Sequence, residues 1–198
     1  VFVGASNQLG EFESGATAAL LGPVGSVVLG GAGSVVVALL WWRLFPALAR
    51  RDQLVRTCTS TVTGQHAGSL VVDGVTCLDG ATVDGSVVVP AGASLLAINS
   101  SISGSVSASR SSAVHLYHST VGDAVVISRT TGSVALVDVT VDDSVVLSRG
   151  DTGTIEPIVA DSTMTGSLVC SGNSPAPINL GAPNAVAGFA GGQCAGLD

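Results

Sequence analysis

Only a few side chains in this sequence could act chemically on a ligand. Three arginines, each preceded by a serine, recur about one repeat apart, at Arg110, Arg129 and Arg149. Guanidinium groups bind carboxylates and phosphates through paired hydrogen bonds, so this column could bind a ligand at the protein surface. Acids lie nearby in the sequence, at Asp123, Asp142, Asp143 and Asp151. The simpler interpretation, which we expect to hold, is a solvated edge on which these arginines and acids form salt bridges.

A second cluster combines aromatic and basic side chains, namely His115, Tyr117 and His118. On a strand, His115 and Tyr117 would point outward on one face, with His118 at the following corner. Imidazole can ligate metals or transfer protons, but no neighbouring repeat supplies a second histidine or a carboxylate beside His115. We therefore predict no metal, cofactor or catalytic residue here. At most, His115 and Tyr117 would join the arginines in surface binding.

A basic column beside acids is also similar to the sites of polysaccharide lyases built on β-helices. Those sites gather acids around calcium and add a basic catalyst. Polygalacturonase-type hydrolases carry paired-aspartate and Arg-Ile-Lys motifs; here no Arg-Ile-Lys motif accompanies the adjacent Asp142 and Asp143, and the sequence has no lysine at all. We expect a non-enzymatic protein and keep a polysaccharide-active enzyme as an alternative.

The charge divides the chain near Arg56. Residues 1–56 hold four arginines and three acids, a net charge of +1, whereas residues 57–198 hold three arginines and eleven acids, a net charge of −8, which together give the −7 of the chain. Nucleic-acid binding needs clustered cations to neutralise phosphates. The acidic C-terminal part argues against a nucleic-acid partner, and aromatic side chains are too scarce to stack bases.

The elements that would position these side chains follow from a repeat after residue 57. A hydroxyl position returns every 19 to 23 residues, at Thr82, Ser101, Thr120, Thr140 and Thr163. Aliphatic residues return with it in pairs two residues apart, which is strand spacing with one face inward. A fixed period of this length is typical of a solenoid. We predict a mainly β fold, a parallel and right-handed β-helix of five to six coils over residues 57–198; a β-sandwich is the alternative.

The four cysteines fall at the two ends of this repeat. Cys58 and Cys77 are one coil apart, and Cys170 precedes a Pro- and Gly-rich tail that contains Cys194. Open solenoid ends must be covered, so we predict the disulfides Cys58–Cys77 and Cys170–Cys194, with residues 171–198 as an irregular cap. Four buried thiols are the alternative; zinc is disfavoured because no CxxC motif occurs.

The N-terminal part contains a long apolar segment. Residues 24–44 hold one charge, near their end, and would span roughly 30 Å as a helix. Trp41 and Trp42 lie at one end, where amphipathic rings prefer the membrane interface. We predict a transmembrane helix over 24–44, with a partial helix over 1–22 and a basic linker over 45–56. A buried soluble helix or strand is the alternative.

Three motifs flank this segment: GASNQLGEFESG at residues 4–15, AALLGPV at 18–24 and LFPAL at 44–48. Together they make residues 1–55 similar to the end of a major facilitator superfamily exporter of the enterobactin-exporter type. The resemblance implies the eleventh helix, in part, and the twelfth. Transport needs both repeats of such a protein, so this chain alone would not transport. Because the chain begins with Val rather than Met, we interpret it as a fusion or a shortened reading frame.

Residues 57–198 resemble the Ser-, Thr-, Val- and Gly-rich β-helical domain of uncharacterised secreted actinobacterial proteins, which end in similar Cys-containing phrases. The resemblance implies a β-helical fold and secretion, and it says nothing about an activity. Arginines after the apolar segment favour a cytoplasmic location by the positive-inside rule, whereas paired cysteines favour an oxidising one. We predict an extracytoplasmic structural, adhesive or cell-wall polysaccharide-associated module, attached to the membrane through residues 24–44. A fragment of an efflux permease with an appended domain is the alternative.

Overall fold

The computed structural model describes residues 58–198 throughout and, before them, residues 19, 22, 24–28, 31–37, 40 and 43. The chain divides into two compact units, Val1–Val55 and Arg56–Asp198. The described residues of the first unit are helical. The predicted span over 24–44 lies partly outside the described residues. Among those that are described, no helix is long and apolar enough to cross a membrane.

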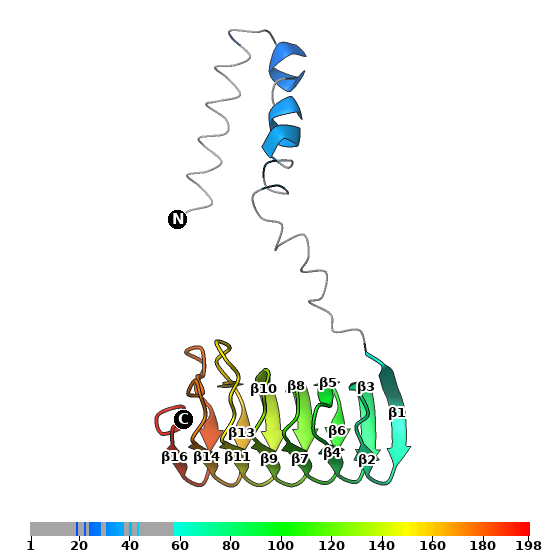
Figure 1. The fold of residues 1–198 in the computed structure, drawn as a ribbon, viewed down its shortest axis with the longest axis vertical. Helices are drawn as coiled ribbons and strands as arrows, with labels where there is room; N and C mark the ends of the chain where they lie inside the picture. Colours follow the sequence, from blue (N-terminus) through cyan, green and yellow to red (C-terminus); the bar gives the residue numbers. More distant parts are fainter. Residues whose placement is uncertain are drawn as a thin grey trace. The chain divides into compact units, whose positions relative to one another are not determined.

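The second unit is a β-solenoid whose strands follow one another in parallel stacks (Figure 1). A nine-stranded sheet contains β1 (Ser60–Ala67), β3 (Val75–Asp84), β5 (Ser94–Ile98), β6 (Ser101–Ile102), β8 (Ala113–Val121), β10 (Val134–Val141), β12 (Ile158–Ala160), β13 (Thr163–Met164) and β15 (Ala185–Val186). A seven-stranded sheet contains β2 (Leu70–Val71), β4 (Val87–Val89), β7 (Val106–Ser109), β9 (Val125–Ser128), β11 (Val145–Ser148), β14 (Leu168–Ser171) and β16 (Ala190–Gly192).

The register is the one that the repeat predicted. The hydroxyl column pairs directly from Thr82 through Ser101, Thr120 and Thr140 to Thr163. One inward column of the seven-stranded sheet runs through Val87, Val106, Val125, Val145 and Leu168, each 0% exposed. β-Branched side chains suit such columns because their stems fit a pleated surface. The solenoid interior is therefore a continuous stack of aliphatic side chains.

The number of coils differs from the prediction. The seven-stranded sheet gives about seven turns rather than five to six. At the start, β1 and β2 pair with β3 and β4. At the end, β15 and β16 pair with β13 and β14. Residues 171–198 thus add a short last coil, whose strands β15 and β16 have only two and three residues. The handedness stays a prediction.

Glycine occupies corners of the coils for two different reasons. Of the corner glycines, Gly153 has a positive φ of 67°, but Gly166 does not. A β-carbon on Gly166 would lie 2.7 Å from the backbone carbonyl carbon of Asp143 and the amide nitrogen of Ser144 in the preceding coil. Close approach of two backbones, not backbone conformation, requires glycine there. One left-handed corner is occupied mostly by larger residues, such as Asn99 (φ 49°) and Asp161 (φ 50°).

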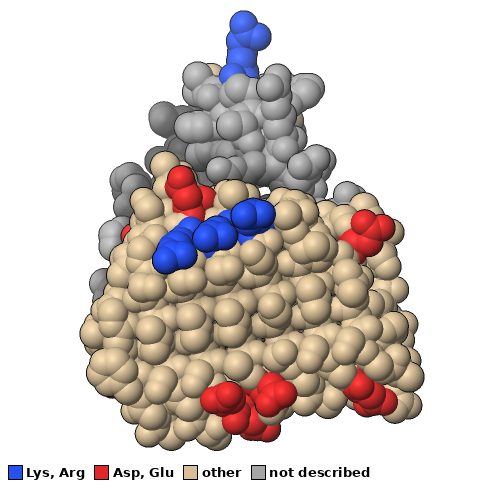
Figure 2. Space-filling model, turned by 60° about the horizontal axis from the view of Figure 1, so that its bottom comes forward, with Lys and Arg blue, Asp and Glu red and all other residues tan. Residues whose placement is uncertain are grey.

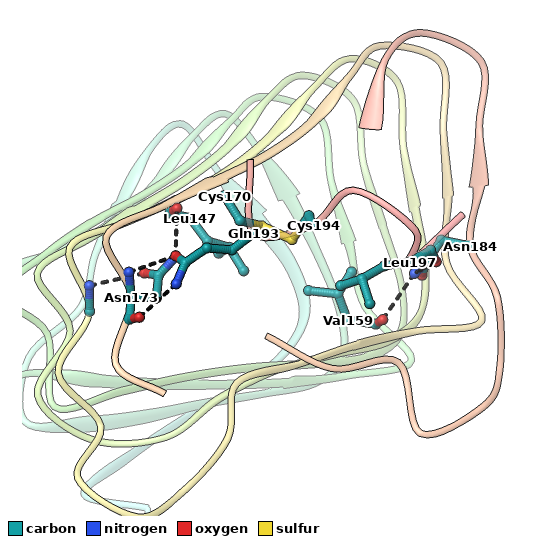
Figure 3. Close-up of a disulfide and its surroundings, with 9 residues drawn as sticks. Leu147, Val159, Cys170, Asn173, Asn184, Gln193, Cys194 and Leu197 are labelled. Atoms are coloured by element: carbon teal, nitrogen blue, oxygen red, sulfur yellow. Dashed lines mark hydrogen bonds between the residues drawn. A yellow bond between two sulfur atoms is a disulfide. The ribbon is translucent and has the colours of Figure 1, made fainter. Parts of the chain in front are cut away.

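Buried polar side chains link the coils at the corner after these left-handed residues. Ser100 Oγ accepts from the Ala81 amide at 3.1 Å, and Ser119 Oγ accepts from the Ser100 amide at 3.1 Å. In the last coil Asn184 takes over this role: its Oδ1 accepts from the Ser162 amide at 3.0 Å. Its Nδ2 donates to the carbonyls of Val159 at 2.9 Å and Leu197 at 2.7 Å (Figure 3). Asn184 therefore joins the C-terminal tail to the solenoid interior.

Candidate functional site

The three arginines occupy the same corner of successive coils, directly after β7, β9 and β11. The Arg110 amide donates to the Ser128 carbonyl at 2.9 Å, and the Arg129 amide donates to the Ser148 carbonyl at 2.8 Å. Arg149 repeats the contact with Ser171 at 2.8 Å. All three side chains are exposed. Stacked strands lie about 4.8 Å apart, so the backbone positions that carry the three guanidinium groups are evenly spaced. We call this column the arginine ladder.

All three arginines have a left-handed backbone, with φ of 54°, 54° and 52°. That conformation costs an ordinary residue roughly 1–2 kcal/mol, and only Gly and, occasionally, Asn or Asp adopt it readily. The equivalent residue of the next coil is Gly172, with φ of 64°. The backbone of this corner therefore favours glycine, and arginine is present in spite of it.

The salt bridges expected for the arginines are not formed. Of the residues that the structure describes, only His118 and Asp138 form an ion pair, with Nδ1 and Oδ2 2.7 Å apart. Like charges about 4 Å apart repel by about 1 kcal/mol even in water. The ladder therefore combines unfavourable backbone conformations with mutual repulsion, and no carboxylate of the described residues offsets either cost through an ion pair.

Figure 2 shows why the neighbouring acids in the sequence do not neutralise the ladder. The basic side chains of the solenoid form one row along an edge of the face in view, and several acidic side chains gather at the opposite edge. One acidic group lies beside the row. Asp123, Asp142 and Asp143 belong to the turns that precede β9 and β11, whereas the arginines follow these strands. The width of the sheet therefore separates these three acids from the arginines, whereas Asp151 follows Arg149 by two residues and forms no ion pair with the ladder.

The outward face of the seven-stranded sheet continues the ladder with two further columns. A serine column lies next to the arginines and consists of Ser109, Ser128, Ser148 and Ser171. A mostly valine column lies beyond it and consists of Val71, Val88, Ser107, Val126, Val146 and Val169. Val71 is 66% exposed and Val126 39% exposed. Cation, hydroxyl and apolar groups thus run in parallel lines across one face.

An exposed aromatic ring lies at the C-terminal end of this face. Gly191 pairs with Val169 and so continues the valine column. The Phe189 ring contacts Gly191, where a β-carbon could not fit beneath it, and the Phe189 side chain is 67% exposed. We did not anticipate the valine column or Phe189 from the sequence. The alternation of inward and outward residues in the valine-rich strands was the available signal for the column.

His115 and Tyr117 point outward on β8, on the nine-stranded sheet rather than on the face of the ladder. Their ring centroids are 6.0 Å apart. His115 Nε2 lies 2.7 Å from Ser133 Oγ, and its partners on the adjacent coils are Leu96 and Ala135. His118 has a φ of 48° and lies at the corner, as expected. The structure therefore does not bring these residues to the arginines.

Both predicted disulfides are present, one at each end of the solenoid. Cys58 bonds Cys77 with their Cα atoms 5.7 Å apart, and Cys170 bonds Cys194 at 5.2 Å (Figure 3). The first bond does not join neighbours in register, however, because Cys77 pairs with Thr61. Cys58 instead lies before β1, and the disulfide joins it to Cys77 in β3, on the next coil. Each bond thus fixes an end segment to an inner coil.

Comparison with known proteins adds no relative. No family model, no curated protein and no solved structure matches the chain. The resemblances to an exporter end and to actinobacterial β-helical domains therefore stay predictions.

Proposed function

We propose that residues 57–198 form a non-catalytic, extracytoplasmic solenoid that associates with cell-wall polysaccharide. The observation that carries this proposal is the pair of disulfides, one closing each end. Disulfides form and persist in oxidising compartments and are rare in the cytosol. A repetitive β-fold fixed in this way is suited to a structural or adhesive role outside the cytoplasm.

Binding rather than turnover is supported by the site with the most unusual chemistry. The arginine ladder offers fixed positive charge, but guanidinium groups stay protonated at all ordinary pH values and are poor proton-transfer groups. The partly buried His115 contacts a serine hydroxyl and lies between aliphatic neighbours. Membrane attachment through residues 24–44 and an origin in a fused exporter end stay predictions.

A sedimentation experiment tests the proposal. Full-length protein is mixed with purified bacterial cell walls, and both the bound protein and the soluble sugars are measured. We expect the oxidised protein to sediment with the walls, the reduced and alkylated protein to bind much less, and no new reducing ends or unsaturated sugars to appear. Release of such products would show an enzyme, and failure to sediment would contradict wall association.

A further inference from the structure

We infer that the arginine ladder is the binding site for a linear acidic polysaccharide, held along the solenoid axis across the outward face of the seven-stranded sheet. This inference rests on the proposed association with polysaccharide and names the ligand class and the residues that bind it. It depends on three features of the described residues: the backbone of the ladder, its lack of ion pairs, and the columns beside it.

The backbone shows that the arginines are not there for folding. Their φ values of 52–54° belong to a region in which the next coil uses Gly172. The other left-handed corner of the solenoid is occupied by Gly80, Asn99, His118, Asp138 and Asp161, which are types that tolerate this conformation, and Leu180 is the one further described residue other than glycine with a positive φ. Strained residues that persist in this way are concentrated at functional sites. Three in one column therefore point to a ligand that needs their side chains.

The charge distribution identifies an anion. The ladder gathers all three arginines of residues 57–198, a part of the chain with a net charge of −8. None of them forms an ion pair with a described residue. Carboxylate and phosphate groups are the ligands that guanidinium binds best. The ladder is thus an unneutralised cationic line on an otherwise acidic molecule.

The repeat favours a polymer over a small anion. Single exposed ion pairs contribute little, about 0–1 kcal/mol in proteins, so one carboxylate on one arginine would bind weakly. A chain with regularly spaced acidic groups engages several arginines at once, and each further contact forms at high effective concentration. The even spacing of the coils, about 4.8 Å, gives the ladder a fixed direction for such a chain.

The neighbouring columns favour sugar over nucleic acid. Serine hydroxyls beside the ladder can both donate to and accept from sugar hydroxyls. The valine column and Phe189 offer apolar surface for the C–H face of a pyranose ring. Nucleic acid would need more cations than three and an array of stacked aromatic rings. A carboxylate-bearing polysaccharide therefore matches all three columns.

Calorimetric titration of the full-length protein with short and long oligogalacturonates tests the assignment. We expect the long chains to bind more tightly than the short ones, and the affinity to fall as salt screens the charges. The triple variant Arg110→Asn, Arg129→Asn and Arg149→Asn should lose roughly tenfold or more in affinity. Its melting temperature should equal or exceed that of the wild type, because asparagine tolerates the left-handed corner.

A charge-matched control separates the ladder from net charge. The variant Thr82→Glu, Thr120→Glu and Thr163→Glu also lowers the charge by three, but on an exposed column that leaves the ladder intact. We expect it to bind nearly as well as the wild type. Equal loss in both variants, or no loss in the asparagine variant, would overturn the assignment.

Two further ligands decide the chemical class. Neutral dextran should not bind. Arginine-dependent binding of inorganic polyphosphate without binding of oligogalacturonate would overturn the choice of a sugar acid. If the asparagine variant still sediments with cell walls while wild-type protein does not bind oligogalacturonate, the proposed wall association stands and the ladder assignment fails.

Discussion

At the scale of single residues, the corners explain which side chains the fold needs and which it only tolerates. Asn184 is needed, because its amide satisfies one backbone donor and two backbone acceptors at the end of the solenoid. The arginines of the ladder are tolerated, because their corner favours glycine and their charges repel. The two groups of residues should respond to mutation in opposite directions.

Replacing the ladder arginines with asparagine should stabilise the protein. We expect a gain of up to about 1 kcal/mol for each of Arg110, Arg129 and Arg149, since both backbone strain and repulsion fall. Urea unfolding of the single and triple variants measures this gain. A clear loss of stability would show that the arginines serve the fold after all.

Asn184→Asp should destabilise the protein by about 1–3 kcal/mol, because a carboxylate oxygen would face the carbonyls of Val159 and Leu197 in place of the donating amide. Asn179→Asp is the matched control, since its Nδ2 makes a longer contact of 3.4 Å with Leu197. Thermal unfolding of both variants at neutral pH makes the comparison. Equal effects would contradict the role given to Asn184.

At the scale of strands and coils, the inner repeats could be predicted and the end coils could not. Inner strands pack on both neighbours, so aliphatic residues recur at every coil, as at Val125 and Val145. β1 has a coil on one side only and is mostly exposed, so its sequence STVTGQHA carries no such pair. The last coil contains strands of two and three residues. End coils bury less surface, so the aliphatic repeat in their sequence is weaker.

The candidate site shows the same limit. The column of Arg110, Arg129 and Arg149 was visible in the sequence, but its lack of ion pairs was not. Proximity in sequence placed Asp123 and Asp143 near the arginines, whereas the strand between them carries these acids to the opposite edge of the sheet. The edge of the sheet at which a turn residue lies depends on where the strands and corners fall within each coil. The repeat length alone does not give these positions.

Adjacent residues of β9 test the inward and outward assignment directly. Val125→Asp should unfold the solenoid, because an unpaired charge in a dry column costs several kcal/mol, comparable with the stability of a domain. Val126→Asp, on the outward face, should leave circular dichroism and melting nearly unchanged. Similar behaviour of the two variants would refute the register.

The close contact between coils gives a second test at this scale. Gly166→Ala should cost about 1–3 kcal/mol, since its β-carbon would meet the backbone of the preceding coil 2.7 Å away. At Gly153 a β-carbon meets nothing within 4 Å, and only the positive φ opposes alanine there. Chemical denaturation should therefore rank Gly166→Ala as the more damaging change.

At the scale of the whole molecule, the solenoid is a stack closed at both ends. The Cys58–Cys77 bond fixes the first coil, and the Cys170–Cys194 bond, with Asn184 and Leu197, fixes the last. Stacked repeats contact only their neighbours, so fraying begins at the ends. The bonds lie at the two places where such a fold opens most easily.

The location of the protein is the central claim, and the state of its cysteines in intact cells tests it most directly. Cells that make the chain are treated with a membrane-impermeant thiol reagent, with and without prior treatment with an impermeant reductant, and the labelled peptides are mapped. The account predicts labelling only after reduction and without lysis, first at Cys58, which is the one partly exposed cysteine of the two disulfides. Free thiols that react only after lysis, with no need for reductant, would place the solenoid in the cytoplasm and contradict the account.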